Sequence, residues 1–198
     1  CNTVAAYPLR SRATIVGNIC NASPAGDTIG ACLLLGGVLH VHGVGGTRQE
    51  PLETFFLGPG KSVLKPGDIA TAIFFPLPPK GLVGTYIKHG RNRRSDLAIV
   101  GVTAVAIPDG KLASGVCVKV ALASVAPVPL VVDTVEAFLA ENALSEAAIE
   151  EAAQIVMDAC NPIDDVRGSA RYRKMMVRNL TRRALTTLCL LYTSPSPR

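Results

Sequence analysis

The sequence has no pattern that indicates a structural zinc site, a disulfide framework or a membrane span. Its six cysteines form no CxxC pair, and no histidine stands at metal-ligand spacing from any of them. No signal-peptide pattern is present, so we expect a cytoplasmic protein with reduced thiols that are buried as small apolar side chains. The longest apolar stretch, residues 29–44, contains glycines and two histidines and is too short to cross a bilayer.

Charged residues are also scarce. They make up 18% of the 198 residues, against 48% hydrophobic residues, which excludes a disordered, self-repelling chain. Glycine (18 residues) and proline (14) are neither periodic nor dominant, so collagen-like and low-complexity classes are excluded as well. The net charge of +5 is concentrated in residues 91–94 and 171–183, and does not by itself imply nucleic acid as a partner.

No Ser/His/Asp or Cys/His set suited to nucleophilic catalysis can be recognised. His40 and His42 share one face of a predicted strand and could bind a metal, but no third ligand is apparent, so packing or edge exposure is preferred. The arginines at 91–94 lack aromatic residues that would stack on bases, which favours a solvated or partner-facing loop. For the arginines at 171–183 we expect a solvated helix face, with contact to a partner subunit as the alternative.

Turn residues and apolar periodicity predict an α+β protein, with strands first and a helical layer later that covers a sheet. Residues 10–32 are predicted to be rich in loops, and Asp27 or Thr28 can cap a short helix that ends near Leu35. Strands are predicted at residues 38–42, 47–50, 69–75, 85–88, 99–107 and 113–121. Helices are predicted after Asp133, which with Glu136 resembles a capping box, and after Ser145 and Ser169.

Two further segments indicate boundaries. The proline-rich residues 76–81 end a strand and are the best candidate for a domain boundary. Residues 189–198 end in Ser-Pro-Ser-Pro-Arg and look like a translated sequencing adapter. We therefore expect a non-native tail there, with a natural Ser/Pro tail as the alternative.

The strongest chemical signal is Thr14-Ile15-Val16-Gly17-Asn18, which is followed by the carboxylate of Asp27. A turn built around glycine can direct several backbone amides at one oxyanion, and Thr and Asn add uncharged donors. A nearby carboxylate can accept hydrogen bonds from sugar hydroxyls. This combination suits a dinucleotide-type cofactor with a pyrophosphate, and an ordinary turn is the alternative.

Four segments also carry a family resemblance: residues 14–27, 55–61, 86–98 and 162–173. In order and spacing they resemble the FAD subunit of the molybdenum hydroxylases, a family that includes carbon monoxide dehydrogenase medium subunits and xanthine dehydrogenase FAD subunits. The similarity covers roughly residues 9–188.

The resemblance implies a fold. The family's FAD-binding domain, of the PCMH type, has two α+β lobes with the cofactor between them and is followed by a sheet-plus-helices domain. Residues 1–77 are expected to be the second lobe, and residues 82–188 the C-terminal domain of the carbon monoxide dehydrogenase flavoprotein type. Because the sequence begins at Cys1 in mid-pattern, we expect an N-terminally truncated fragment that lacks the first lobe and is inactive alone.

The resemblance also implies a set of cofactor contacts, and no metal ligand. Ile69 is expected to approach the FAD, and Leu97 to lie near one face of its ring. Lys88 is expected near the isoalloxazine edge, where a cation could stabilise negative charge on a reduced flavin. Val16 departs from the family, which commonly has glycine there, and its Cβ limits backbone approach to the ligand. The full set is Thr14, Ile15, Val16, Gly17, Asn18, Asp27, Ile69, Lys88 and Leu97.

The function implied is that of an oxidoreductase flavoprotein subunit, which passes electrons from a [2Fe-2S] partner through FAD to an external acceptor. Molybdopterin and the [2Fe-2S] clusters are expected on partner subunits, an iron-sulfur small subunit and a molybdopterin large subunit, in a dimer of heterotrimers. One alternative is a non-catalytic interaction module that has lost FAD binding. A second alternative is nucleic-acid binding through the basic helix, which would depend steeply on salt.

Overall fold

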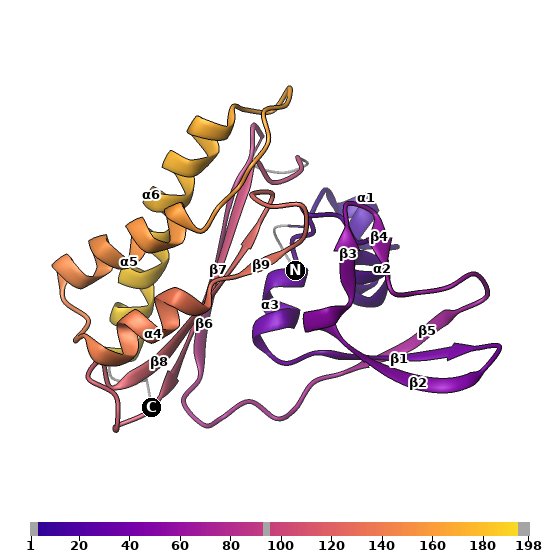
Figure 1. Ribbon diagram of the computed structural model, residues 1–198, viewed down its shortest axis with the longest axis horizontal. Helices are drawn as coiled ribbons and strands as arrows, with labels where there is room; N and C mark the ends of the chain where they lie inside the picture. The colour runs from indigo at the N-terminus through magenta and orange to yellow at the C-terminus, as the bar shows by residue number, and fades with distance from the viewer. Residues whose placement is uncertain (1–3, 93–95, 194–198) are drawn as a thin grey trace.

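The computed structural model describes residues 4–92 and 96–193, with no statement on the side chain of Thr193. Arg93, Arg94 and the end of the predicted tail at 194–198 lie outside the described residues. Figure 1 shows an N-terminal part with short helices and small sheets beside a C-terminal part in which helices cover one face of a longer sheet. This arrangement confirms the predicted α+β class.

The N-terminal part is built around the antiparallel sheet β2-β1-β5 and a two-stranded sheet β3-β4. Its core gathers Ile19, Ile29, Leu39, Val41 and Phe55, each of which is fully buried. In chain order the elements are α1 (Tyr7–Arg10), α2 (Ile15–Cys20), α3 (Ile29–Leu34), β1 (Val38–Gly43), β2 (Gly46–Pro51), η1 (Leu52–Thr54), β3 (Phe56–Gly58), β4 (Lys61–Ser62) and β5 (Ile69–Phe74). The strands predicted at 38–42, 47–50 and 69–75 are therefore confirmed.

The prediction of loops over residues 10–32 is wrong at α2. Residues 15–20 include a glycine and an asparagine, both weak helix formers, so the local sequence does not favour a helix. Two other contributions stabilise α2. The Thr14 side chain caps its first turn, and Ile19 is completely buried in the N-terminal core.

The C-terminal part is an antiparallel meander, β6-β7-β8-β9, and the helices α4, α5 and α6 cover one face of it (Figure 1). Its core runs from the sheet into the helices and includes Val102, Val118 and Leu185. In chain order the elements are β6 (Val83–His89), β7 (Val100–Pro108), β8 (Val116–Ala123), β9 (Leu130–Val131), α4 (Asp133–Glu141), α5 (Glu146–Asp158) and α6 (Ala170–Thr193).

Most predicted elements of this part are confirmed, with two corrections. Strand β8 begins at Val116, three residues later than predicted, because residues 109–115 form a wider turn in which Asp109 N donates to Gly115 O. The capping box at Asp133 does not form. Glu136 instead approaches Lys119 (Oε1–Nζ 3.7 Å) and accepts from Cys117 Sγ (3.1 Å).

Helix α3 packs on the C-terminal sheet, against β7 and β8, and so joins the two parts. A Cβ on Gly30 would lie 2.5 Å from Thr103 Oγ1, so only glycine permits this approach. Strand β7 is consequently buried over its first seven residues, which are apolar or small except for Thr103. The contact fixes the N-terminal part against the sheet.

Helix α6 continues through Thr193 and therefore includes the first five residues of the segment predicted to be a non-native tail. Cys189 of that segment is partly buried against the C-terminal core. Within the described ranges, no helix is both long and apolar enough to span a membrane.

Candidate functional site

A cavity of about 460 Å³ opens beside α2 and brings together four residues of the 14–18 segment: Thr14, Ile15, Gly17 and Asn18. We call it the α2 cavity. Arg10, Arg12, Asn21 and Thr28 add polar groups to its wall, and none of its lining residues is acidic. The remaining lining residues are Val4 and Ala13.

The segment 14–18 forms the start of a helix, whereas a turn around glycine was predicted. Thr14 is extended (φ −122°, ψ 155°), and its Oγ1 accepts a hydrogen bond from Gly17 N at 2.9 Å. A Cβ at position 17 would lie 2.9 Å from that same oxygen, so glycine leaves room for the cap. The Thr14 hydroxyl therefore accepts within the helix and keeps its own proton for a ligand.

Asn18 and Val16 point to different surroundings. Asn18 Oδ1 accepts from Thr28 Oγ1 at 2.7 Å, so the NH2 group of Asn18 is left as the donor toward the cavity that this side chain lines. Val16 is half-buried, packs against the N-terminal core and is not part of the cavity wall. The side chain that departs from the family pattern therefore does not narrow the cavity.

We expect Thr14→Val to lower the free energy of unfolding by about 1 kcal/mol, because the first turn of α2 loses its side-chain cap. Thr14→Ser keeps the oxygen and should retain most of the stability. Thermal or urea unfolding of the three proteins checks this result. Equal stability of Thr14→Val and the parent would show that the cap contributes nothing to α2.

Asp27 does not cap α3. The N-cap is Thr28, whose side chain makes no capping hydrogen bond to the helix, and the Asp27 carboxylate turns toward β6 instead. Its Oδ1 accepts from Tyr86 Oη and its Oδ2 from Lys88 Nζ, both at 2.6 Å. The Asp27 and Lys88 side chains are only 8% and 12% exposed. Two predicted site residues are thus brought together as a nearly buried ion pair that joins the two parts of the molecule.

Tyr86 is a member of this site that sequence reasoning did not single out. Burial, together with the Asp27 carboxylate, raises the pKa of Tyr86, which stays a neutral hydrogen-bond donor. Gly101 pairs with Lys88 on the neighbouring strand, and a Cβ there would lie 2.8 Å from Tyr86 Oη. The available signal was the spacing of two, which places Tyr86 and Lys88 on the same face of a strand.

Ile69 and Leu97 lie outside the α2 cavity. Ile69 begins β5, is 65% exposed and pairs with His42 of β1; α2 packs beside the same strand. Leu97 is also exposed and lines a separate cavity of about 380 Å³ with Pro24, Pro59 and Arg173. The structure therefore places four of the five residues of segment 14–18 around one cavity and joins Asp27 and Lys88 in one ion pair. Ile69 and Leu97 lie apart from the α2 cavity.

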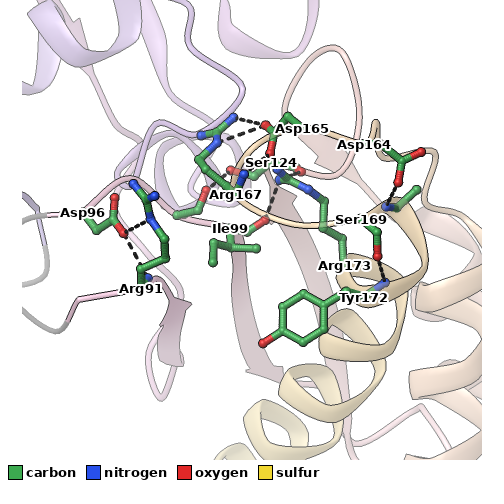
Figure 2. A network of polar contacts seen from close by, with 12 residues as sticks. Arg91, Asp96, Ile99, Ser124, Asp164, Asp165, Arg167, Ser169, Tyr172 and Arg173 are labelled. Atoms are coloured by element: carbon green, nitrogen blue, oxygen red, sulfur yellow. Dashed lines mark hydrogen bonds and ion pairs between the residues drawn. The ribbon is translucent and has the colours of Figure 1, made fainter.

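The recognised segment 162–173 forms a polar network, shown in Figure 2. Arg173 is 1% exposed; its Nη1 donates to the carbonyls of Ile99 (2.8 Å) and Ser124 (2.9 Å), and its Nη2 to Asp165 Oδ1 (2.6 Å). Arg167 binds the other oxygen of Asp165. The Arg167 hydrogen bond, with Arg173 beside it, holds the pKa of Asp165 well below its usual value. These groups are bound to one another and fasten α6 to the sheet.

The structure also shows the surroundings of His40, His42 and Arg91, for which the sequence left alternative roles open. His42 Nδ1 lies 3.2 Å from Thr47 Oγ1, and His40 Nε2 lies 3.5 Å from Gln49 Nε2. Among residues 4–92 and 96–193, no group of three His, Cys, Asp or Glu side chains could hold a metal ion. Arg91 is paired with Asp96 at 3.1 Å.

Comparison with known proteins decides the family. The sequence model of the CO dehydrogenase flavoprotein C-terminal domain matches residues 85–188, and that of the FAD binding domain in molybdopterin dehydrogenase matches residues 1–78. The chain belongs to the CO dehydrogenase flavoprotein family. The resemblance predicted from the four segments is therefore confirmed.

Individual relatives support the same family assignment. The chain is 26% identical to the xanthine dehydrogenase FAD-binding subunit of Escherichia coli O157:H7 over 93% of its length, and 30% identical to the carbon monoxide dehydrogenase medium chain of Afipia carboxidovorans over 89%. It spans 63% and 60% of the lengths of these relatives. The structure of carbon monoxide dehydrogenase from Hydrogenophaga pseudoflava, which lacks the Mo-pyranopterin moiety, matches 96% of the chain with a TM-score of 0.88 and 28% identity, over 65% of that chain.

The lining of the α2 cavity fits the anionic part of a flavin dinucleotide. It offers uncharged donors from Thr14 and Asn18, two arginines and no carboxylate. A second cavity of about 440 Å³, between η1 and α4, has three carboxylates and one cation, Lys119, in its lining, and this net negative charge would repel a diphosphate. Of these two cavities, only the one built from the family segment has the appropriate charge.

Proposed function

We propose that this chain binds FAD, with the dinucleotide held at the α2 cavity. The observation that carries the proposal is the gathering of Thr14, Ile15, Gly17 and Asn18 around a cavity with no acidic lining, in the region matched by a FAD-binding family. Bound FAD would supply the redox chemistry, and the protein its position and electrostatic environment.

Within this proposal the remaining predicted residues have distinct roles. The Lys88 ammonium, held by Asp27, is a cation that can stabilise negative charge on a reduced flavin. Ile69 and Leu97 are exposed apolar side chains that can cover the ring system. Val16 contributes backbone only, because its side chain is part of the N-terminal core.

We further propose that the whole protein is the flavoprotein subunit of a molybdenum-containing dehydrogenase. Its relatives include a carbon monoxide dehydrogenase medium chain and a xanthine dehydrogenase FAD-binding subunit. These names support the proposal that the protein works together with partner subunits. An iron-sulfur small subunit would deliver electrons and a molybdopterin large subunit would oxidise the substrate, in a dimer of heterotrimers. Isolation of the native complex with molybdenum and iron analysis tests this assembly.

The FAD proposal is tested by titrating FAD into the chain and following flavin fluorescence. We expect weak but saturable quenching, because the chain spans only 63% and 60% of the lengths of the relatives named above. The affinity should be about tenfold weaker still for Asn18→Leu, which removes the NH2 donor. Asn179→Leu changes an exposed asparagine on α6 and serves as the matched control, with the affinity of the parent. Absence of binding by the parent would contradict the proposal that this chain by itself binds FAD. Equal affinity of Asn18→Leu and the parent would place the site elsewhere.

A further inference from the structure

The two arginines of the α2 cavity differ in their contacts. Arg10 is half-buried, and its Nη1 donates to the carbonyls of Val4 (2.9 Å) and Ala5, so it holds the start of the chain. Arg12 lies between α1 and α2 and is exposed; its backbone N donates to Leu9 O. In the part of the chain that the structure describes, the Arg12 side chain has no hydrogen bond and no ion pair.

Most other arginines among the described residues are, by contrast, in ion pairs. Arg173 and Arg167 share Asp165, Arg48 is bound to Asp68 and Glu50, and Arg178 is paired with Glu150. Arg12 faces a cavity that contains no carboxylate to neutralise it. The nearest acidic residue in sequence, Asp27, is occupied on both oxygens by Tyr86 and Lys88.

We infer that Arg12 binds the diphosphate of the dinucleotide, an assignment that rests on the proposed function. A guanidinium group can donate two parallel hydrogen bonds to phosphate oxygens, and the diphosphate is the anionic group of FAD. The Thr14 hydroxyl and the Asn18 NH2 group supply uncharged donors on the same wall. Arg12 thus provides the charge, and the 14–18 segment provides the neutral contacts.

The assignment predicts a discrimination between ligands. Loss of the Arg12 charge should weaken FAD binding about ten- to a hundredfold, which is the usual effect of removing a charge-assisted hydrogen bond. Binding of riboflavin, which has no phosphate, should change by less than about twofold, because only the phosphate contact is lost. Inorganic pyrophosphate should bind the parent and compete with FAD.

The experiment measures binding of FAD, riboflavin and pyrophosphate by calorimetry to the full chain and three variants. Arg12→Gln removes the charge, and Arg12→Lys retains it. Arg171→Gln removes another exposed arginine, on α6, that has no side-chain partner among the described residues. We expect weaker FAD and pyrophosphate binding in Arg12→Gln, partial recovery in Arg12→Lys and parental affinities in Arg171→Gln.

Three outcomes would overturn the assignment, and each can be told apart from failure of the proposed function. If Arg12→Gln binds FAD as the parent does, or if Arg171→Gln weakens FAD equally, Arg12 is a solvated surface residue. If pyrophosphate binding depends on Arg12 but no variant and no parent binds FAD, the anion site stands and the FAD proposal fails. Equal loss of riboflavin and FAD affinity would mean that Arg12 acts on the fold instead of the phosphate.

Discussion

Replacing Arg173 by methionine is expected to lower the free energy of unfolding by about 3–5 kcal/mol, a large part of the stability of a typical domain. The substitution leaves the carbonyls of Ile99 and Ser124 without their donor and takes one guanidinium from Asp165. Methionine fills similar space, so the loss reflects mainly the missing hydrogen bonds. Urea unfolding measures it, and Arg171→Met, an exposed position one half-turn earlier on α6, is the control, expected within about 0.5 kcal/mol of the parent.

The effect of Arg173→Met should also depend on pH. Because the folded-state pKa of Asp165 is lowered, the charged carboxylate stabilises the fold above its unfolded pKa of about 4, and this contribution is lost as pH falls through the folded pKa. The difference in stability between parent and Arg173→Met should therefore narrow in acid. A constant difference from neutral pH to pH ~2 would show that the ion pair contributes nothing and that the carbonyl contacts explain the whole loss.

Replacing Asp27 by alanine is expected to lower the free energy of unfolding by about 3 kcal/mol, because a nearly buried Lys88 ammonium loses its carboxylate and Tyr86 loses its acceptor. The double variant Asp27→Ala/Lys88→Met removes both charges and should recover part of the loss. Asp158→Ala, at an exposed acidic residue at the end of α5, is the control for removing a carboxylate, expected near the parent.

The same variants separate two roles of Asp27 toward the cofactor. Both carboxylate oxygens are occupied inside the protein, so Asp27 acts on FAD through Lys88 and through the contact between the two parts. FAD affinity should then follow stability and recover partly in the double variant. Loss of FAD affinity with unchanged unfolding would contradict this account and make Asp27 a direct ligand.

Features of the fold that depend on neighbouring residues could be predicted from the sequence. The hairpin around residues 43–46 and the helix capped by Ser145 follow from turn and capping residues a few positions apart. Helix α2 could not be predicted in this way, because its stability comes from burial of Ile19 in a core assembled from distant strands. The capping box at Asp133 fails for the same kind of reason, since Glu136 finds Lys119 and Cys117 on β8.

In the candidate site, too, features that depend on neighbouring residues could be predicted, and contacts between distant residues could not. The donors of segment 14–18 were predicted from residue type, and the structure places four of the five around one cavity. The partners of Asp27 are 59 and 61 residues away in sequence, and a local motif carries no information on such a pairing. A role for Arg12 could not be predicted, because Arg10 and Arg12 match no sequence motif for anion binding. Their position beside segment 14–18 becomes apparent only from the lining of the α2 cavity.

A crystal structure of the chain with FAD tests the central claim most directly. The account predicts one FAD per chain, with its diphosphate within hydrogen-bond distance of segment 14–18 and of Arg12. Density for FAD in the acidic cavity lined by Glu53, Asp133 and Glu136, or in the cavity beside Leu97 with segment 14–18 untouched, would contradict the account.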